Sequence, residues 1–195
     1  MHRRSESFSI TIVAVLGLLG AAVPARAAEG HAFVGANKCK MCHINEAKSW
    51  SQTKMANAFE LLKPGVNAEA KKKAGLDSAK DYTKDVTCLP CHTTGYGKPG
   101  GFVDFATTPN LAGVGCEMCH GAGGSYAVDA LMSLKNKEYK KADVVAAGLV
   151  ATVTEAQCLS CHNNKSPFVG KDYKFDFVTR KEQGTHQKFP LKFQH

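Results

Sequence analysis

Residues 116–120 read Cys116-Glu117-Met118-Cys119-His120, and the same C-x-x-C-H pattern occurs three more times in the chain. The other copies are Cys39-Lys40-Met41-Cys42-His43, Cys88-Leu89-Pro90-Cys91-His92 and Cys158-Leu159-Ser160-Cys161-His162. All eight Cys of the chain belong to these four motifs, and none is left over. Because the pattern includes every Cys, it indicates one shared role for all eight. The rest of the chain then has to fold around the group that the four motifs bind.

C-x-x-C-H is the attachment signal for c-type haem. The two thiols form thioether bonds with the two vinyl groups of the porphyrin, and the adjacent His binds the iron from one side. The sequence therefore predicts four covalently attached haem c groups. The predicted attachment residues are Cys39, Cys42, Cys88, Cys91, Cys116, Cys119, Cys158 and Cys161, and the predicted proximal ligands are His43, His92, His120 and His162.

Three other uses of these cysteines have to be weighed against haem attachment. Disulfides are common in secreted chains, paired C-x-x-C motifs form Cys₄ zinc sites, and a lone C-x-x-C is found in thiol redox centres. None of these requires a His directly after the second Cys. With only 8 His among 195 residues, four such coincidences are improbable, which favours haem.

The N-terminal residues have the pattern of a secretory signal peptide. His2-Arg3-Arg4 is a basic region, Phe8–Val23 is an apolar run, and Ala25-Arg26-Ala27 is an A-x-A cleavage site. An uncleaved anchor is the alternative, but the apolar run has 16 residues, and a spanning helix needs about 20. We predict a signal peptide over residues 1–27, a tetrahaem domain over residues 28–195, location in the periplasm, and no membrane span after cleavage.

Composition and charge restrict the fold and the partners. Charged residues make up 22% and hydrophobic residues 44% of the chain, which excludes a disordered tail and a multi-span membrane protein. The formal net charge of +8 suits an acidic protein partner or the anionic propionates of haem, and outside the cytoplasm it argues against nucleic acid. Because few residues are available per haem, we predict a mainly α, compact fold wrapped around four covalent haems, with little β-structure.

Hydrophobic spacing and capping signals predict several elements between the motifs. Helices are predicted over Ile44–Leu62, Ala68–Ala74 and Ser125–Lys141, and a capping box over Thr154–Gln157. Alternating Tyr173, Phe175 and Phe177 are typical of a short strand, and Gly95–Gly101 of a loop. The Lys clusters at 71–73 and 135–141 are predicted to be solvated helix faces, and Asp104 and Glu117 to be surface carboxylates.

The His count limits the distal, or sixth, iron ligands. Four bis-His irons would need four further His, but after the signal peptide only His31, His186 and His195 remain. At least one iron therefore has a Met ligand or an open position. After the predicted signal peptide, Met55 and Met132 are the Met residues outside the motifs. On the predicted helix, Met55 lies about 18 Å beyond His43, so it would serve a different haem or pack as a core residue.

The chain resembles the tetrahaem cytochrome c-554 family. The resemblance is carried by the four motifs, by Ala68–Asp85, by Leu111–Gly123 and by Trp50 and Phe175-Asp176, and it extends over nearly the whole chain after the signal peptide. It implies a mainly helical periplasmic protein that receives electrons from hydroxylamine oxidoreductase. It also implies that the haems lie in closely stacked pairs and that the iron of the second haem is five-coordinate.

The resemblance also implies particular distal ligands. His186 matches the distal His opposite His120, and Met55 stands where the family has the distal His opposite His162. Residues 121–157 contain no His to serve the first haem, and Tyr126 and Met132 are nearby instead. The haem at His92 is left as the open one, and Ser166-Pro167-Phe168 resembles the loop that covers that iron.

These observations predict a carrier that relays single electrons between redox proteins. Expected partners are a hydroxylamine oxidoreductase-like donor and a quinol or cytochrome acceptor. The alternative is an enzyme that reduces nitric oxide, nitrite or hydroxylamine at a five-coordinate haem held by His92. A third possibility is a filament in which neighbouring chains lend His31 or His195 as ligands.

Overall fold

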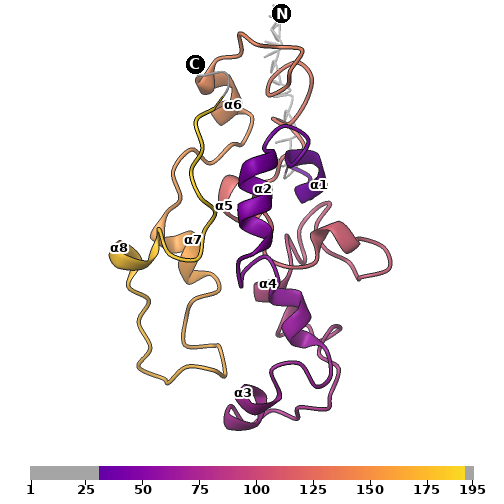
Figure 1. Ribbon diagram of the computed structural model, residues 1–195, viewed down its shortest axis with the longest axis vertical. Coiled ribbons are helices and arrows are strands. Elements are labelled where there is room, and N and C mark those ends of the chain that lie inside the picture. Colours follow the sequence, from indigo (N-terminus) through magenta and orange to yellow (C-terminus); the bar gives the residue numbers. More distant parts are fainter. Residues whose placement is uncertain (1–30, 192–195) are drawn as a thin grey trace, which may run out of the picture.

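The computed structural model describes residues 31–191 and consists mainly of short helices joined by loops (Figure 1). The α-helices in this range are α1 (Ala36–Cys39), α2 (Ile44–Ser51), α3 (Ala68–Lys73), α4 (Leu89–His92), α5 (Glu117–His120), α6 (Lys141–Ala146), α7 (Glu155–Leu159) and α8 (Phe177–Arg180). Two 3-10 helices are η1 (Ala58–Leu62) and η2 (Pro109–Leu111). Over residues 31–191, β-pairing is limited to two isolated bridges, Thr93 with Ala112 and Ser133 with Asn136. The prediction of a mainly α fold with little β-structure is confirmed.

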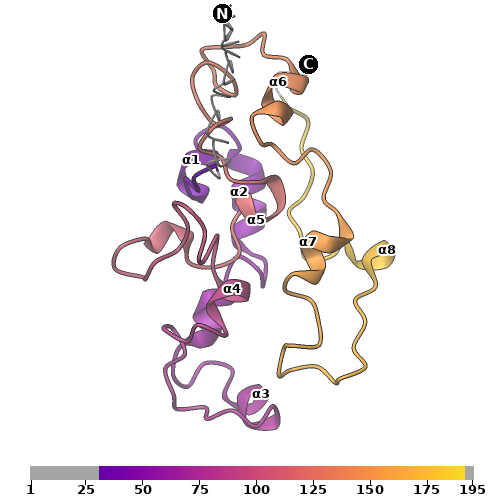
Figure 2. The ribbon, with the colours of Figure 1, turned by 180° about the vertical axis from the view of Figure 1, so that it is seen from behind.

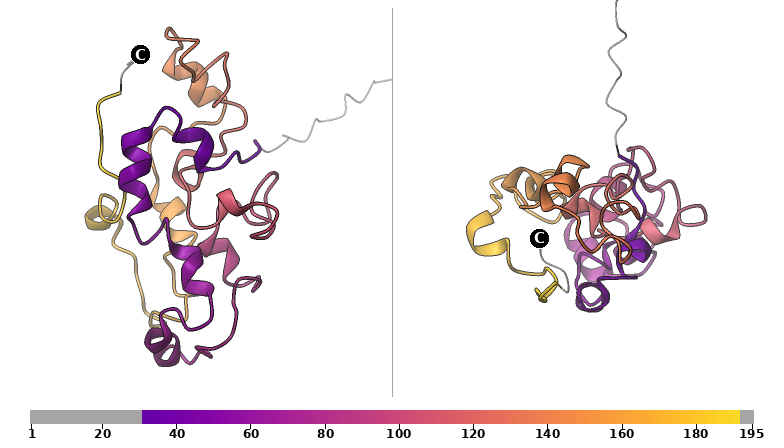
Figure 3. Two further views of the ribbon diagram at one scale, coloured as in Figure 1. Left: turned by 45° about the vertical axis from the view of Figure 1, so that its right-hand side comes forward. Right: turned by 90° about the horizontal axis from the view of Figure 1, so that it is seen from above.

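The elements form an elongated molecule with two sides. Along the long axis, α3 lies at one end and α6 at the other, with α1, α2, α4 and α5 between them (Figures 1 and 2). The second side consists of α7, α8 and the segment that follows α8 (Figure 3). The backbone N–H of Gln187 in that segment donates to Ser49 Oγ of α2 at 2.9 Å, which joins the two sides.

One apolar cluster supports the second motif. Its buried members are Phe59, Leu62, Tyr82, Leu89, Phe102 and Leu111. The rings of Phe59 and Phe102 lie 5.4 Å apart between centroids, within the range of favourable aromatic pairs. Since Phe59 belongs to η1 and Leu89 to α4, the cluster packs these two helices together and so fixes the position of His92, the last residue of α4.

The predicted single helix over Ile44–Leu62 is wrong, because α2 ends at Ser51 and η1 begins only at Ala58. The amide of Asn57 donates to the carbonyls of Ser51 and Thr53, at 2.8 and 2.9 Å. These side-chain bonds give the backbone an alternative to helical pairing. Met55 therefore lies in a turn, and the distance along a helix no longer decides which iron it can reach.

The predicted helix over Ser125–Lys141 is also wrong, because these residues form turns and α6 begins only at Lys141. The amide of Asn136 donates to the carbonyl of Ala130 at 2.8 Å, and Ser133 Oγ donates to the carbonyl of Asp129 at 2.9 Å. Side-chain bonds of Ser and Asn to nearby backbone favour turns in the same way.

The predicted strand at Tyr173, Phe175 and Phe177 is wrong as well. Phe177 opens α8, and the Asp176 side chain caps this helix by accepting from the N–H of Thr179 at 3.2 Å. The short helix after Asn67 and the Thr154 capping box are confirmed by α3 and α7. No helix within residues 31–191 is long and apolar enough to cross a membrane. The predicted signal peptide, residues 1–27, lies outside the described residues.

Candidate haem site

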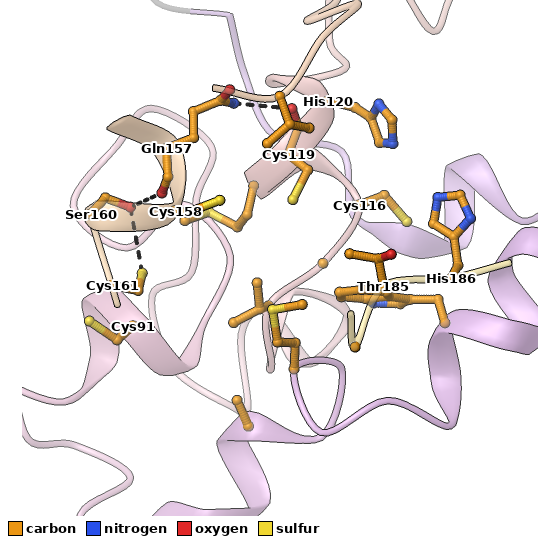
Figure 4. A pocket seen from close by; sticks show the side chains of 18 of the residues that line it. Cys91, Cys116, Cys119, His120, Gln157, Cys158, Ser160, Cys161, Thr185 and His186 are labelled. Atoms are coloured by element: carbon orange, nitrogen blue, oxygen red, sulfur yellow. Dashed lines mark hydrogen bonds between the residues drawn. The ribbon is translucent and has the colours of Figure 1, made fainter. Parts of the chain in front are cut away.

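All four C-x-x-C-H motifs open onto one cavity of about 2070 Å³ between the two sides of the molecule (Figure 4). Its lining includes all eight motif cysteines and the four His that follow them. Typical small-molecule pockets measure about 300–1,000 Å³, so this cavity has room for several large ligands. Its size and its thiol and imidazole lining fit a set of haem c groups.

The local backbone directs the three functional side chains of each motif the same way. The N–H groups of His43, His120 and His162 donate to the carbonyl of the first Cys of their motif, at 3.0, 2.9 and 2.8 Å. In the remaining motif, α4 ends on His92 itself. Residues i, i+3 and i+4 of a helical turn share one face. Both thiols and the imidazole therefore face one porphyrin position, as covalent attachment requires.

The motifs approach one another in two pairs. The thiols of Cys39 and Cys116 are close enough that each shifts the pKa of the other, which is raised for Cys39 and lowered to about 7 for Cys116. In the other pair, Cys161 Sγ lies 3.9 Å from the carbonyl of Pro90, the residue before Cys91, and the side chains of Cys91 and Cys161 lie next to each other in Figure 4. The first motif is thus adjacent to the third, and the second to the fourth, an arrangement that suits stacked haem pairs.

A further bond joins the two pairs. Gln157 of α7 donates from Nε2 to the carbonyl of Cys119 at 3.1 Å, drawn as a dashed line in Figure 4. The fourth motif begins at Cys158, directly after Gln157, so this bond holds the fourth motif against the third. All four motifs are consequently arranged in one continuous group.

Three of the four motif His residues have the environment of metal ligands. Burial lowers the pKa of His92, His120 and His162, which favours the neutral imidazole that binds metals. His92 Nδ1 lies 2.6 Å from the carbonyl of Ala58. Such a bond to a backbone carbonyl orients a ligating imidazole and leaves Nε2 for the metal.

His186 faces His120 across the cavity (Figure 4). The two ring centroids are 6.2 Å apart, with 34° between the ring planes. His186 Nδ1 is bonded to the carbonyl of Gln187 at 2.7 Å, so Nε2 is the nitrogen left for a metal. The separation leaves space for one metal atom between two imidazoles, since metal–nitrogen bonds are about 2.0 Å long.

The other predicted distal ligands, Met55 and Met132, also line the cavity, and both are half-buried. Ser166, Pro167 and Phe168 belong to the same lining. Tyr126 lies there too, but its hydroxyl donates to the carbonyl of Gly121 at 2.9 Å.

The two remaining His residues are not part of the described cavity lining. His31 is exposed, and its Nδ1 lies 2.6 Å from Ser125 Oγ. His195 lies outside the described residues.

Glu117 is a buried residue, so the prediction of a surface carboxylate is wrong for it. Only 3% of its surface is exposed. Its carboxylate accepts from the backbone N–H groups of Val34, Gly35 and Gly123, at 2.9, 2.8 and 2.7 Å. Since α1 follows Gly35 and α5 begins at Glu117, this single side chain fixes the first motif against the third. Asp104, the other carboxylate, is partly exposed.

Two features of the cavity were not predicted from the sequence, namely the position of Phe175 and the burial of Lys71. Phe175 stacks on His162 with 4.8 Å between ring centroids. Lys71 is 3% exposed, which contradicts the prediction of a solvated face for this member of the 71–73 cluster, whereas Lys72 and Lys73 are exposed. The alternating aromatic residues at 173–177 had indicated a strand that includes Phe175. Lys71 has the same residue type as Lys72 and Lys73, and it is buried because its side chain lies on a different face of α3.

Comparison with known proteins agrees with this site. The family model "Cytochrome c554 and c-prime" matches residues 38–121. Cytochrome c-554 of Nitrosomonas europaea is 36% identical over 181 residues, which cover 82% of this chain and 77% of the relative. The structure of reduced cytochrome c554 from the same organism matches with a TM-score of 0.73, covering 84% of this chain and 89% of that one. Identity at this level over more than two thirds of both chains places the protein in the cytochrome c-554 family, among the haem c cytochromes that serve electron transport.

Proposed function

We propose that this cytochrome relays single electrons between redox partners through four covalently attached haem c groups. The observation that carries the proposal is the single cavity onto which all four motifs open. Haem c, when bound, supplies one-electron chemistry at its iron. Four such groups confined to one cavity have to lie close together, which is the condition for transfer from one to the next.

The protein's own residues hold and orient these groups. Each C-x-x-C pair provides the two thioether sulfurs, and His43, His92, His120 and His162 provide the proximal imidazoles. His186 is proposed as the distal ligand opposite His120, on the strength of the 6.2 Å between the two rings. Met55 is proposed opposite His162, and Met132 as a distal candidate for the first haem. Since Met/His ligation raises the potential relative to bis-His ligation, the ligands would grade the four potentials.

The processing and location proposed for the chain follow from its N-terminal pattern. Residues 1–27 are proposed as a signal peptide that is removed, and residues 28–195 as the tetrahaem domain. Its place is then the periplasm, where covalent haem cytochromes meet their redox partners.

The proposed partners are redox proteins of acidic surface. Removal of residues 1–27 would take away Arg3, Arg4, Arg26 and Glu6, so the formal net charge of +8 would become +6. This excess of Lys and Arg favours such partners through electrostatic steering. A hydroxylamine oxidoreductase-like donor and a quinol or cytochrome acceptor fit this role. Rates of reduction by an acidic donor are expected to fall as salt rises, because exposed charges more than about 8 Å apart are screened at physiological ionic strength.

The experiment for the relay is a stopped-flow count of delivered electrons. Fully reduced holoprotein is mixed anaerobically with an excess of an oxidised small cytochrome c, and the electrons received per molecule are measured. We expect four electrons, and three from a Cys158→Ala/Cys161→Ala variant that lacks the fourth attachment site. Delivery of one electron, with the other haems still reduced at the end of the reaction, would rule out the relay.

A second function, reduction of a small nitrogen compound at an open iron, is supported by the number of candidate distal ligands. Outside the motifs, the described cavity lining holds one His and two Met, namely His186, Met55 and Met132, for four proposed irons. One iron, proposed to be that of His92, is then open to nitric oxide, nitrite or hydroxylamine. Low-temperature EPR of the oxidised protein tests this: a high-spin signal that changes when nitric oxide is added supports an open iron, whereas only low-spin signals exclude it.

A further inference from the structure

Lys71 is a buried lysine in the wall of the cavity. The whole residue is 3% exposed, and it lines the cavity beside the second motif. Its Nζ donates to the carbonyl of Lys63 at 2.7 Å and lies 5.4 Å from the ring centroid of Tyr82. Both contacts are with neutral groups, so neither neutralises the ammonium charge.

No carboxylate in residues 31–191 forms an ion pair with Lys71. Its neighbour Lys80 differs in this respect. Lys80 Nζ also lies over the Tyr82 ring, at 4.7 Å, but it pairs with Asp85 Oδ2 at 3.4 Å. Buried charges in proteins are paired as a rule, because the cost of removing a lone ion from water is large. The charge of Lys71 contributes, as the last of several causes, to the lowered pKa of the exposed Asp81, but the two side chains form no ion pair. The described residues therefore leave Lys71 without a carboxylate in direct contact.

The position of this cation is fixed by the apolar cluster. Tyr82 belongs to the same buried cluster as Leu89, the first residue of α4. α4 ends on His92, and both Cys88 and His92 line the cavity with Lys71. Lys71 therefore lies beside the second motif. The motif residues of the cluster around Tyr82 are Leu89 and, packed against it, Cys88, both of which belong to this motif.

We propose that Lys71 pairs with a propionate carboxylate of the haem attached to Cys88 and Cys91, and that its charge raises the reduction potential of that haem. The inference rests on the proposed haem attachment at the second motif. Haem brings its own carboxylates, and a charge-assisted bond from an ammonium to a carboxylate is among the stronger hydrogen bonds. A fixed cation stabilises the ferrous state relative to the ferric state because the ferric state carries one more positive charge.

The test compares Lys71→Met with Lys72→Met in the holoprotein. Lys72 is the next residue of α3, is exposed, and has a surface ion pair with Glu69 at 3.1 Å, so it is a matched control. Visible spectra recorded during a redox titration give the four potentials, and the haem content is measured on the same samples. We expect one potential to fall in Lys71→Met by at least a tenfold change in its equilibrium constant, which is 59 mV for one electron. Lys71→Arg is expected to restore it, and Lys72→Met to leave all four unchanged.

Four unchanged potentials in a Lys71→Met protein with its full haem content would overturn the inference. A crystal structure of the wild-type holoprotein provides a test that does not depend on the variant's folding. There, Lys71 Nζ is expected at about 2.8 Å from a propionate oxygen, and a Nζ bonded only to the Lys63 carbonyl would contradict the inference. Failure of the proposed function is distinguishable, since it would be seen in the wild type as missing haem or undelivered electrons.

Discussion

Glu117 is the single side chain on which the relative position of the first and third motifs depends most. Its carboxylate receives three backbone N–H groups, from residues just before α1 and just after α5. A carboxylate can accept all three, whereas a Gln amide would present an N–H donor to one of them. The stability of this junction therefore depends on the negative charge of one buried residue.

Glu117→Gln is expected to lower the free energy of unfolding by about 2–3 kcal/mol, the cost typical of a buried charged hydrogen-bonding group that loses a partner. Guanidinium titration of the holoprotein measures the change. Glu69→Gln is the control, since Glu69 is 89% exposed and its ion pair with Lys72 contributes about 0–1 kcal/mol. Equal stability of Glu117→Gln and wild type would contradict the assigned role.

His186→Ala is expected to open one iron, the one proposed to lie between His186 and His120. The variant should gain a high-spin ferric EPR signal and bind cyanide at one additional haem, because an axial ligand has been lost. His31→Ala is the control, as His31 is exposed and is not part of the cavity lining. An unchanged EPR spectrum of His186→Ala would exclude His186 as a ligand.

At the residue level, the sequence was sufficient to predict the motif residues of the site, but it was insufficient to predict the residues that surround them. C-x-x-C-H is a local pattern, and the structure brings all twelve of its functional residues to one cavity. Glu117 is a charged residue whose burial depends on partners distant in sequence, and the partners of Lys71 are the carbonyl of Lys63 and the ring of Tyr82, neither of which belongs to a motif. Val34, which donates to Glu117, is 83 positions away. Spacing and composition carry no information on such contacts.

At the scale of elements, the motifs lie on or directly beside helices of one or two turns. A side-chain cap fixes the start of α7, whereas α1, α4 and α5 have none. α7, which carries Cys158, begins at the Thr154 capping box. Gln157 of the same box also bonds to the carbonyl of Cys119. A helix this short is not stable by itself, so its cap and its contacts maintain the position of the fourth motif.

Thr154→Ala is expected to destabilise the protein by about 1 kcal/mol, because the helix loses a side-chain cap. Thermal unfolding of the holoprotein, followed by circular dichroism, measures the effect. Thr152→Ala, an exposed Thr two residues earlier and outside the helix, serves as the control. A melting temperature of Thr154→Ala equal to that of Thr152→Ala would indicate that the cap contributes nothing.

The element with a capping signal, at Thr154, was predicted correctly, and the two long helices predicted from hydrophobic spacing were not. The short helix α3 was also found, although it has no side-chain cap. The helices over Ile44–Leu62 and Ser125–Lys141 failed because Asn57 and Asn136 bond to nearby carbonyls and turn the chain. Apolar residues at 3–4 spacing can also line a cofactor cavity from turns, as Met55 and Met132 do.

At the scale of the whole molecule, the cavity takes the place of a conventional core. The buried apolar residues of the described chain are few, and six of them form the cluster near α4. Protein interiors are closely packed, whereas the centre of this molecule is a cavity of about 2070 Å³ lined by the motif residues. The cofactors are therefore expected to supply most of the apolar contacts that stabilise the fold.

Protein produced without haem attachment is expected to lack a cooperative thermal transition and most of its helical circular dichroism signal. The holoprotein, with the same residues 28–195, is the control and should unfold cooperatively. Denaturation of both forms, followed by far-ultraviolet circular dichroism, makes the comparison. A haem-free chain that unfolds cooperatively with the helix content of the holoprotein would show that the fold does not depend on the cofactors.

The proposed relay depends on four haem c groups that are covalently held in one cavity by the four motifs. Mass spectrometry of the intact purified protein under denaturing conditions tests this attachment most directly, because only covalently attached haem remains on the chain. We expect the mass of residues 28–195 plus four haems. A mass corresponding to fewer haems, or to the bare chain with haem released, would contradict it.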